Sequence, residues 1–295
     1  MDNNDLVSAL VNRAEGFQDR APVFHIEQPS VEDSIARARS AARFVWNQFG
    51  DCSLRPDPVS TDLSRMQLPN EGRVDVFHSS GAIAAYMHPP TSRQPLTPNE
   101  RLADRKALSA LTERVAESIA KTHVTSDEQL RFESLWELKG HGVTLKGEKS
   151  PVALFEVLGA FRRYLHGLPV LGRASIHVAL GGASLVTRWG IDWRQVRTKP
   201  FAETAIISPE EGAKRVLDDL FWRRPERPFT LADFEVDAFN LGYLSFSRRR
   251  VQFVMQPTWL AVLKPRPPMT MGTVVAVAAA PQAFEPLSHT KMPVA

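Results

Sequence analysis

Apolar residues recur at helical spacing in three parts of the chain, each directly after a helix-start signature. The signature is a hydroxyl residue followed three positions later by a carboxylate, a pair that can satisfy free amides of a first helical turn. It occurs at residues 30–33, 97–100 and 208–211, and Pro98 and Pro209 occupy the first helical position in two of them. The apolar positions that follow predict three amphipathic helices. They are Val31, Ile35, Ala38, Ala42, Val45 and Phe49 in the first, Leu108, Leu111, Val115 and Ile119 in the second, and Ala213, Val216, Leu217 and Leu220 in the third.

Between and after these helices, the apolar pattern changes to short runs that are typical of strands. Gly181 and Gly182 separate two of these runs and suit the tight turn of a hairpin. The predicted strands cover residues 74–77, 82–86, 132–138, 152–164, 175–180, 184–189, 234–246, 251–256, 259–263 and 273–279. Several antiparallel strands would then flank each helix. This order predicts an α+β fold with two or more units, each a helix packed on an antiparallel sheet.

Glycines and polar residues near the middle of the chain indicate a domain boundary. Gly140, Gly142 and Gly147 cluster there among polar residues. The predicted organisation is an N-terminal α+β unit at 1–140, a C-terminal α+β unit at 141–285 and a tail at 286–295. Within the first unit, the proline-rich run at 55–58 is expected to be a loop.

Composition and charge narrow the function classes. The chain has 295 residues, of which 43% are hydrophobic and 23% charged, and its formal net charge is +3. Because no long block of like charges occurs, neither a nucleic-acid nor a membrane partner is expected. Cys52 is the only cysteine, so an intrachain disulfide and a cysteine-based zinc site are excluded. The polar N-terminus lacks the features of a secretory signal and no apolar run is long enough to span a bilayer, which predicts a cytoplasmic protein.

The sequence contains none of the common catalytic signatures. It has no Walker-type phosphate loop, no dinucleotide-binding fingerprint, no nucleophile elbow and no His-Glu-x-x-His motif. These absences argue against the common nucleotide-binding, hydrolase and zinc-protease classes, but they leave room for an enzyme that works through the shape of a pocket. The eight histidines are scattered without the spacing of metal ligands, so no metal site and no cofactor is predicted.

Aromatic and arginine side chains are the remaining candidates for binding. Sheet-borne aromatic residues either fill a core, which is their more common role, or line a ligand cavity. Those in or beside predicted strands are Trp136, Trp189, Trp193, Tyr243 and Trp259. Trp193 and Arg194 directly follow a strand, so we expect them to be more exposed than the others. The arginines at 162–163, 223–224 and 248–250 could contact an anionic ligand or form a solvated strand edge.

Part of the chain resembles the PepSY-type propeptide domain family. The similar segments are FRRYLHGLPVLG at residues 161–172, SIHVALGG at 175–182, the Trp193-Arg194 pair, and residues 208–213, 241–243 and 256–259. The resemblance covers about residues 150–285. It implies tandem helix-plus-sheet units and a binding role, often as an inhibitory or chaperoning prosegment. Members of that family are secreted or membrane-attached, whereas this sequence predicts neither a signal peptide nor an attached protease domain, which argues against the inhibitory role.

Two function classes follow from these observations. The first is a non-catalytic binding protein that uses concave antiparallel sheets to hold a peptide, a protein or an apolar small molecule. Its predicted contact residues are Trp193, Arg194, Tyr243 and Trp259. The alternative is a cofactor-independent biosynthetic enzyme of the cyclase or isomerase type, with a pocket between the two units. Its acid–base candidates are His166, His177 and Glu156.

Overall fold

The computed structural model describes most of the chain. The described residues are 3–45, 56–68, 72–87, 105–121, 123–125, 127–143, 145–149, 151–173, 175–182, 185–223, 233–267 and 270–287. The helix start predicted at residues 97–100 lies outside these ranges, as do Phe49 and Cys52.

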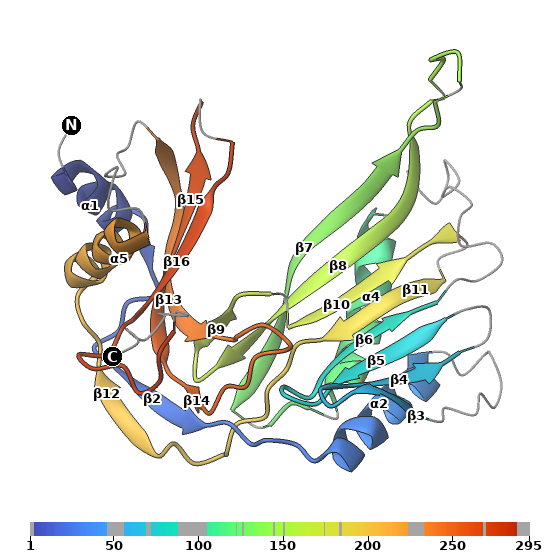
Figure 1. Ribbon diagram of the computed structural model, residues 1–295, viewed down its shortest axis with the longest axis horizontal. Helices are drawn as coiled ribbons and strands as arrows, with labels where there is room; N and C mark the ends of the chain where they lie inside the picture. The colour runs from blue at the N-terminus through green and yellow to red at the C-terminus, as the bar shows by residue number, and fades with distance from the viewer. Residues whose placement is uncertain are drawn as a thin grey trace.

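The described residues form mostly β-structure (Figure 1). The helices are α1 (Asn3–Val11), α2 (Val31–Val45), α4 (Arg105–Ala120) and α5 (Pro209–Arg223). The strands are β1 (Ala14–Glu15), β2 (Arg20–His25), β3 (Pro56–Ser60), β4 (Leu63–Gln67), β5 (Arg73–Phe77), β6 (Ala82–Tyr86), β7 (Glu128–Gly140), β8 (Ala153–Leu165), β9 (Leu168–Leu171), β10 (Ile176–Leu180), β11 (Val186–Ile191), β12 (Ala202–Ala205), β13 (Phe234–Leu244), β14 (Val254–Met255), β15 (Pro257–Pro265) and β16 (Thr273–Ala278).

One large mixed sheet runs through both halves of the molecule. Its thirteen strands follow the order β16-β15-β13-β9-β8-β10-β11-β6-β5-β4-β3, with β1 added beside β13 and β7 beside β8. A second sheet of three strands has the order β12-β2-β14. The predicted α+β fold of separate helix-on-antiparallel-sheet units is therefore wrong. The described chain has four helices against this large sheet, and β9 pairs with β13 in parallel.

Part of this error comes from strands that the local pattern hides. The run at 55–58 was expected to be a loop, yet Pro56 and Pro58 belong to β3. Because β3 is the last strand of the sheet, it needs no amide donors on its outer edge, and proline is tolerated there. Strands β1, β9 and β12 have two to four residues each, too few to show an alternating pattern.

Two of the predicted helix starts are confirmed by their capping hydrogen bonds. The amide of Asp33 donates to Ser30 Oγ at 3.0 Å at the start of α2. The amide of Glu211 donates to Ser208 Oγ at 3.3 Å at the start of α5. Helix α1 has no such signature and was not predicted; its Leu6 is buried in the core.

The short strand β9 joins the two halves of the large sheet. It forms a hairpin with β8 in which Leu165 pairs with Leu168. The two turn residues, His166 and Gly167, have φ angles of 47° and 81°, the positive values that a type I′ turn requires. Beyond the turn, Val170 pairs with Tyr243 of β13. The few residue pairs that β9 forms with β8 and β13 connect the two halves of the sheet.

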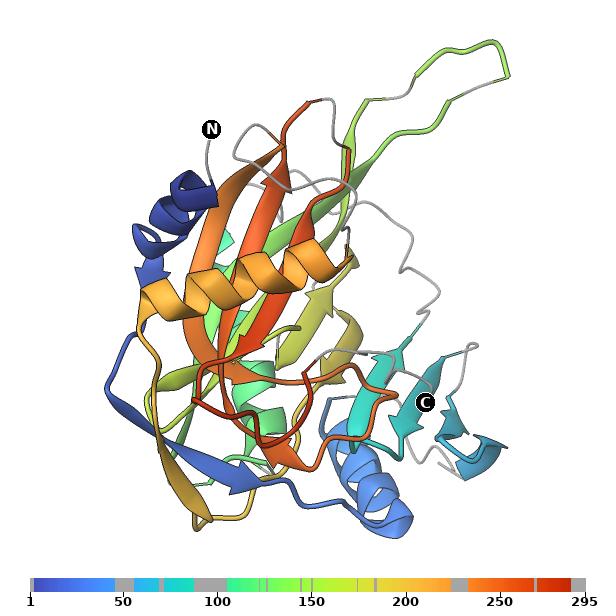
Figure 2. The ribbon, with the colours of Figure 1, turned by 60° about the vertical axis from the view of Figure 1, so that its left-hand side comes forward.

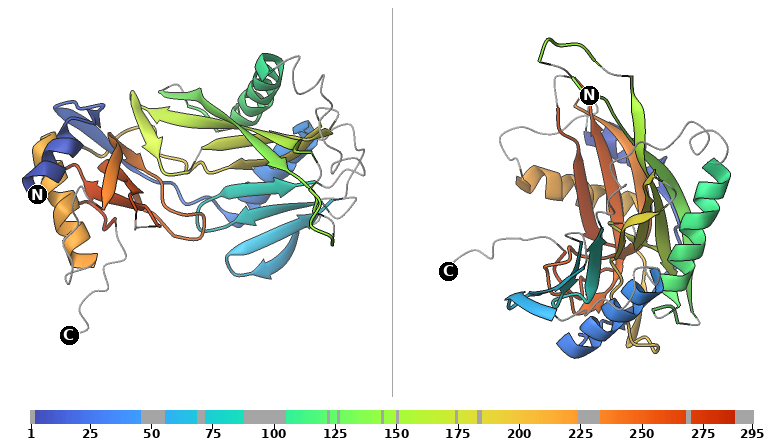
Figure 3. Two further views of the ribbon diagram at one scale, coloured as in Figure 1. Left: turned by 90° about the horizontal axis from the view of Figure 1, so that it is seen from above. Right: turned by 90° about the vertical axis from the view of Figure 1, so that its right-hand side faces the viewer.

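Each half has its own hydrophobic core. Helices α2 and α4 cover one face of the half that contains β4 to β8, β10 and β11. Helices α1 and α5 cover the face of β13, β15 and β16 that points away from β7 and β8 (Figures 2 and 3). The predicted division of the chain at residue 140 stays a prediction, and both cores contain residues from either side of that position.

No helix in the described ranges is long and apolar enough to cross a membrane. The cytoplasmic location stays a prediction.

Candidate ligand-binding cleft

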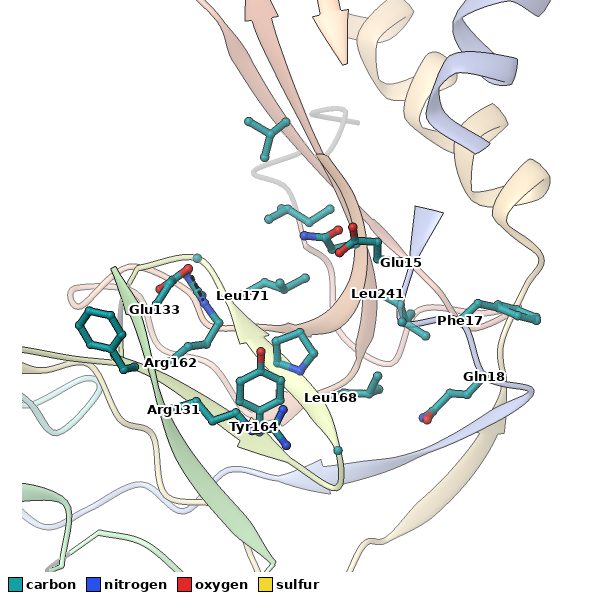
Figure 4. Close-up of a pocket in the computed structure, with 18 residues that line it drawn as sticks. Glu15, Phe17, Gln18, Arg131, Glu133, Arg162, Tyr164, Leu168, Leu171 and Leu241 are labelled. Carbon is teal, nitrogen blue, oxygen red and sulfur yellow. Dashed lines mark hydrogen bonds and ion pairs between the residues drawn. The ribbon is translucent and has the colours of Figure 1, made fainter. Parts of the chain in front are cut away.

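A cleft of about 770 Å³ lies where the two halves of the sheet meet at β9 (Figure 4). Eighteen residues from β1 and the segment after it, β7, β8, β9, β13 and β15 line this cleft. They are Glu15, Gly16, Phe17, Gln18, Arg131, Phe132, Glu133, Arg162, Tyr164, Gly167, Leu168, Pro169, Leu171, Gly172, Asn240, Leu241, Leu260 and Val262. We call this hollow the cleft.

One wall of the cleft carries apolar side chains from β9 and β15, next to the polar Asn240 of β13 and Glu15 of β1. Leu168 and Leu171 come from β9, and Leu260 and Val262 come from β15. Residues 260 and 262 are half-buried and alternate with the fully buried core residues of β15. This alternation directs them away from the core that α5 covers. The outer face of β15 therefore forms an apolar surface of the cleft.

The opposite wall carries charged and polar side chains from β7 and β8. Arg162 donates hydrogen bonds to the Glu133 carboxylate from Nε at 2.9 Å and from Nη2 at 2.6 and 2.8 Å. A β-bulge between Phe132 and Ser134 makes Glu133 an extra residue in β7. Such a bulge re-aims a side chain, and here it brings the carboxylate beside Arg162, which also donates to the Val170 carbonyl at 2.7 Å.

Tyr164 extends this polar wall toward the turn at residue 166. Its ring lies under the Arg131 guanidinium, with 4.2 Å between the guanidinium carbon and the ring centroid. Figure 4 shows the Tyr164 hydroxyl pointing into the cleft. The wall thus offers a phenol and a paired guanidinium within the same hollow, opposite the apolar surface of β15.

A second, smaller hollow of about 380 Å³ lies further along the same face of the sheet. We call it the His177 pocket. Its lining residues are Tyr86, Trp136, Leu158, Ala160, Arg173, His177, Arg188, Asp192 and Arg248. Ala160 of this pocket and Arg162 of the cleft are two positions apart on β8, so both hollows open on one face of the strand.

His177 is half-buried on the floor of this pocket, between two small residues. It pairs with Ala160 of β8 on one side and with Gly190 of β11 on the other. A methyl group on Gly190 would overlap the imidazole, so only glycine leaves room for the ring in this position. Burial first, and then the positive charge of Arg248, lowers the pKa of His177 to about 4. The imidazole is therefore neutral at pH 7.

Two of the three arginines around His177 have carboxylate partners. Arg248 binds Asp192 through Nε at 2.5 Å and Nη2 at 2.8 Å. Arg188 binds Glu156 through Nη2. The third, Arg173, is exposed and forms no ion pair with any carboxylate in the described ranges.

The four predicted contact residues are buried, with Trp193 and Arg194 at 2% exposure and Tyr243 and Trp259 at 0%. The expectation that Trp193 and Arg194 are exposed is wrong, because Trp193 lies in the core that α2 and α4 cover and the loop at 245–251 covers Arg194. The Arg194 guanidinium donates to the carbonyls of Ser79, Ser247 and Arg250 at 3.2, 2.9 and 2.7 Å. Burial lowers its pKa to about 10, so it keeps its charge at neutral pH.

Tyr243 and Trp259 likewise contribute to the interior. The Tyr243 hydroxyl donates to the Pro22 carbonyl at 2.9 Å, and burial raises its pKa. The Trp259 ring stacks on Phe239 with 4.7 Å between the ring centroids. Side chains without exposed surface cannot touch an external partner, so we do not place these residues in the candidate site.

Of the three acid–base candidates, His177 and Glu156 lie at or beside one pocket, and His166 lies apart from them. His166 is exposed on the β8–β9 turn, where its ring packs beside Phe24 with 5.1 Å between the ring centroids. His177 lies in the second pocket. The Glu156 carboxylate accepts hydrogen bonds from Thr187 Oγ1 at 2.6 Å and from Arg188, which leaves it engaged beside that pocket.

The residues that form the cleft were not singled out from the sequence as a set. Arg162 belongs to one of three arginine groups considered for anion binding, and Glu133 lies in the predicted strand at 132–138 without a signal of its own. Tyr164 carried no signal apart from its place in a predicted strand. The structure places Arg162 and Tyr164 on the face of β8 opposite the core, but the sequence LGAFRRY at residues 158–164 does not alternate between apolar and polar, because Leu158 is on the open face and Arg163 is buried.

Comparison with known proteins supports the fold but gives no family. No protein-family model matches the chain, and no curated protein matches it. Among solved structures, it is similar to an uncharacterized protein from Eubacterium rectale ATCC 33656, with a TM-score of 0.55 and 10% sequence identity. The similarity covers 95% of this chain and 97% of that chain. At this identity the likeness shows the fold alone, and the resemblance to PepSY-type domains stays a prediction.

Proposed function

We propose that the protein is a non-catalytic binding protein and that its ligand is a small, largely apolar molecule held in the cleft. The observation that carries this proposal is the contrast between the two walls. An apolar surface from β9 and β15 faces Arg162, Tyr164 and Glu133 across a hollow of about 770 Å³. Small-molecule sites combine a mostly apolar lining with a few placed polar groups, and they favour the junction between structural units.

In this proposal the apolar body of the ligand lies on Leu260 and Val262, and its polar groups face the opposite wall. Arg162 already has both a carboxylate and a carbonyl as partners. It therefore acts as a fixed support rather than as a free cation seeking an anion. The Tyr164 hydroxyl can donate one hydrogen bond to the ligand and accept another. A neutral molecule with few polar groups fits this arrangement better than a charged one.

Nile red, a neutral dye whose fluorescence rises in an apolar environment, tests the proposal. We expect saturable binding to the wild-type protein. Val262→Glu should weaken it by about tenfold or more, because a carboxylate on the apolar wall must be desolvated when the dye binds. The matched control is Val59→Glu, which places the same change on the exposed surface of β3, far along the sheet.

The control should bind the dye like the wild type, and far-UV circular dichroism should show that both variants are folded. Absence of saturable binding to the wild-type protein would overturn the proposal. Equal binding by Val262→Glu and wild type would also overturn it, because the dye would then lie elsewhere.

The alternative of a cyclase or isomerase has less support from the geometry. The histidine and glutamate side chains suggested for acid–base chemistry lie outside the cleft. The enzyme alternative stays a prediction, and we assign no reaction to the cleft.

A further inference from the structure

The His177 pocket has a flat floor between two taller walls. Cross-strand pairing places Trp136 beside Leu158, Leu158 beside Ala179, and Ala179 beside Arg188. These four residues therefore form one row across β7, β8, β10 and β11. Three strand spacings separate the ends of the row, which is about 14 Å. The indole of Trp136, 64% exposed, stands at one end, and the Arg188 guanidinium stands at the other.

The charges around the pocket do not cancel. The lining contains the three guanidinium groups of Arg173, Arg188 and Arg248 and the carboxylate of Asp192. Glu156, which binds Arg188 from outside the lining, is the second carboxylate. Among the residues that the structure describes, these three positive and two negative groups leave a net charge of +1. Because His177 is neutral at pH 7, it adds no charge to this total.

We propose that the His177 pocket binds a small aromatic carboxylate, with its carboxylate held by Arg173, the arginine without an ion pair among the described residues, and its ring packed on the floor at Leu158 beside Trp136. A single negative charge matches the net charge of the pocket. Guanidinium groups suit the planar, two-oxygen shape of a carboxylate. The flat floor and the indole provide the surface on which an aromatic ring packs. This proposal is independent of the ligand proposed for the cleft.

His177 has a supporting role in this site. Its ring fills the space above Gly190 and lies between the arginines. A neutral imidazole has one N–H donor and one acceptor nitrogen. It can donate one hydrogen bond to the ligand without adding a charge that would require a second anion.

Titration calorimetry with 2-naphthoate tests the proposal, with 2-naphthamide as the neutral analogue and inorganic phosphate as an anion without a ring. We expect 2-naphthoate to bind the wild-type protein at least about tenfold more tightly than either analogue. Arg173→Gln and Trp136→Ala should each weaken 2-naphthoate binding by about tenfold. Both side chains are exposed, so neither change removes core packing.

Arg20→Gln is the matched control, because Arg20 lies on β2 of the second sheet and its exposed side chain pairs with Glu203 outside the pocket. It should bind 2-naphthoate like the wild type. All of these variants should bind Nile red normally, which separates this site from the cleft. Equal affinity for 2-naphthoate and 2-naphthamide would overturn the proposal, as would unchanged 2-naphthoate affinity in Arg173→Gln. Tighter binding of phosphate than of 2-naphthoate would contradict the aromatic carboxylate as the ligand class.

Discussion

Glu133 and Arg162 form a two-pronged ion pair across a β-bulge, and this pair sets the polar wall of the cleft. Directly opposite Arg162 in the strand register is Arg131. Like charges opposite each other are destabilising. The bulge compensates for this repulsion by adding a carboxylate to the same face. Arg162 also ties β8 to β9 through the Val170 carbonyl, so the pair supports the joint between the two halves.

This relationship predicts a measurable coupling between the two side chains. A double-mutant cycle with Glu133→Gln and Arg162→Gln should give a coupling energy of about 1 kcal/mol, because a two-pronged pair of partly exposed groups exceeds the usual surface pair only slightly. The measurement is the free energy of unfolding in urea for the four proteins. A coupling energy indistinguishable from zero would show that the pair does not hold the wall.

A second prediction concerns Gly190 and His177. Gly190→Ala should destabilise the protein by about 1–3 kcal/mol, because the added methyl group meets the imidazole and the strand must shift. In a His177→Ala background the same change should cost clearly less, since the ring is gone. Urea unfolding of the four variants measures both costs. An equal cost of Gly190→Ala in the two backgrounds would mean that the imidazole does not lie over Gly190.

The third prediction concerns Arg194 and the loop at 245–251. Arg194→Gln removes a charged donor from three carbonyls, two of which belong to that loop. The loop contains three consecutive arginines at 248–250, each a trypsin site. We expect trypsin to cleave there at least about fivefold faster in the variant, because cleavage needs local opening of the segment. Mass spectrometry of the fragments identifies the site.

Arg197→Gln is the control for this experiment, because Arg197 is exposed on the same segment as Arg194. It should be cleaved like the wild type. Unchanged cleavage in Arg194→Gln would show that this guanidinium does not hold the loop.

A fourth prediction concerns pH. Burial lowers the pKa values of both His177 and His123 to about 4, from 6.5. The unfolded chain therefore takes up these protons first as the pH falls. The free energy of unfolding should decrease between about pH 6.5 and about pH 4, and these two groups cause no change above that window. His177→Gln should make the decrease shallower, as measured by urea unfolding across this range. An identical decrease in wild type and variant would contradict the lowered pKa of His177.

Local signals predicted local structure well in this chain. The caps at Ser30 and Ser208 needed only the neighbouring residues, and both helix starts are confirmed. The single large sheet could not be predicted in the same way. It depends on pairing such as that of Val170 with Tyr243, between residues far apart in the sequence and in strands too short to show a pattern.

The same reasoning explains why the expected binding residues are core residues. Trp193 and Arg194 follow a strand, and the sequence does not indicate that any other segment packs over them. The burial of Arg194 comes from the loop at 245–251, which belongs to the other half of the molecule, whereas Trp193 is buried in the core that α2 and α4 cover. The cleft, in turn, exists only because β9 brings β8 beside β13. The sequence of β8 did not identify which side chains face outward, because Leu158 lies on the open face and Arg163 is buried.

The most direct measurement is a crystal structure of the protein soaked with Nile red. We predict density for the dye between the β15 surface at Leu260 and the β8 wall at Tyr164, with the rings against Val262. Dye density at any other place on the molecule, with the cleft empty, would contradict the claim that this cleft is a binding site for an apolar molecule.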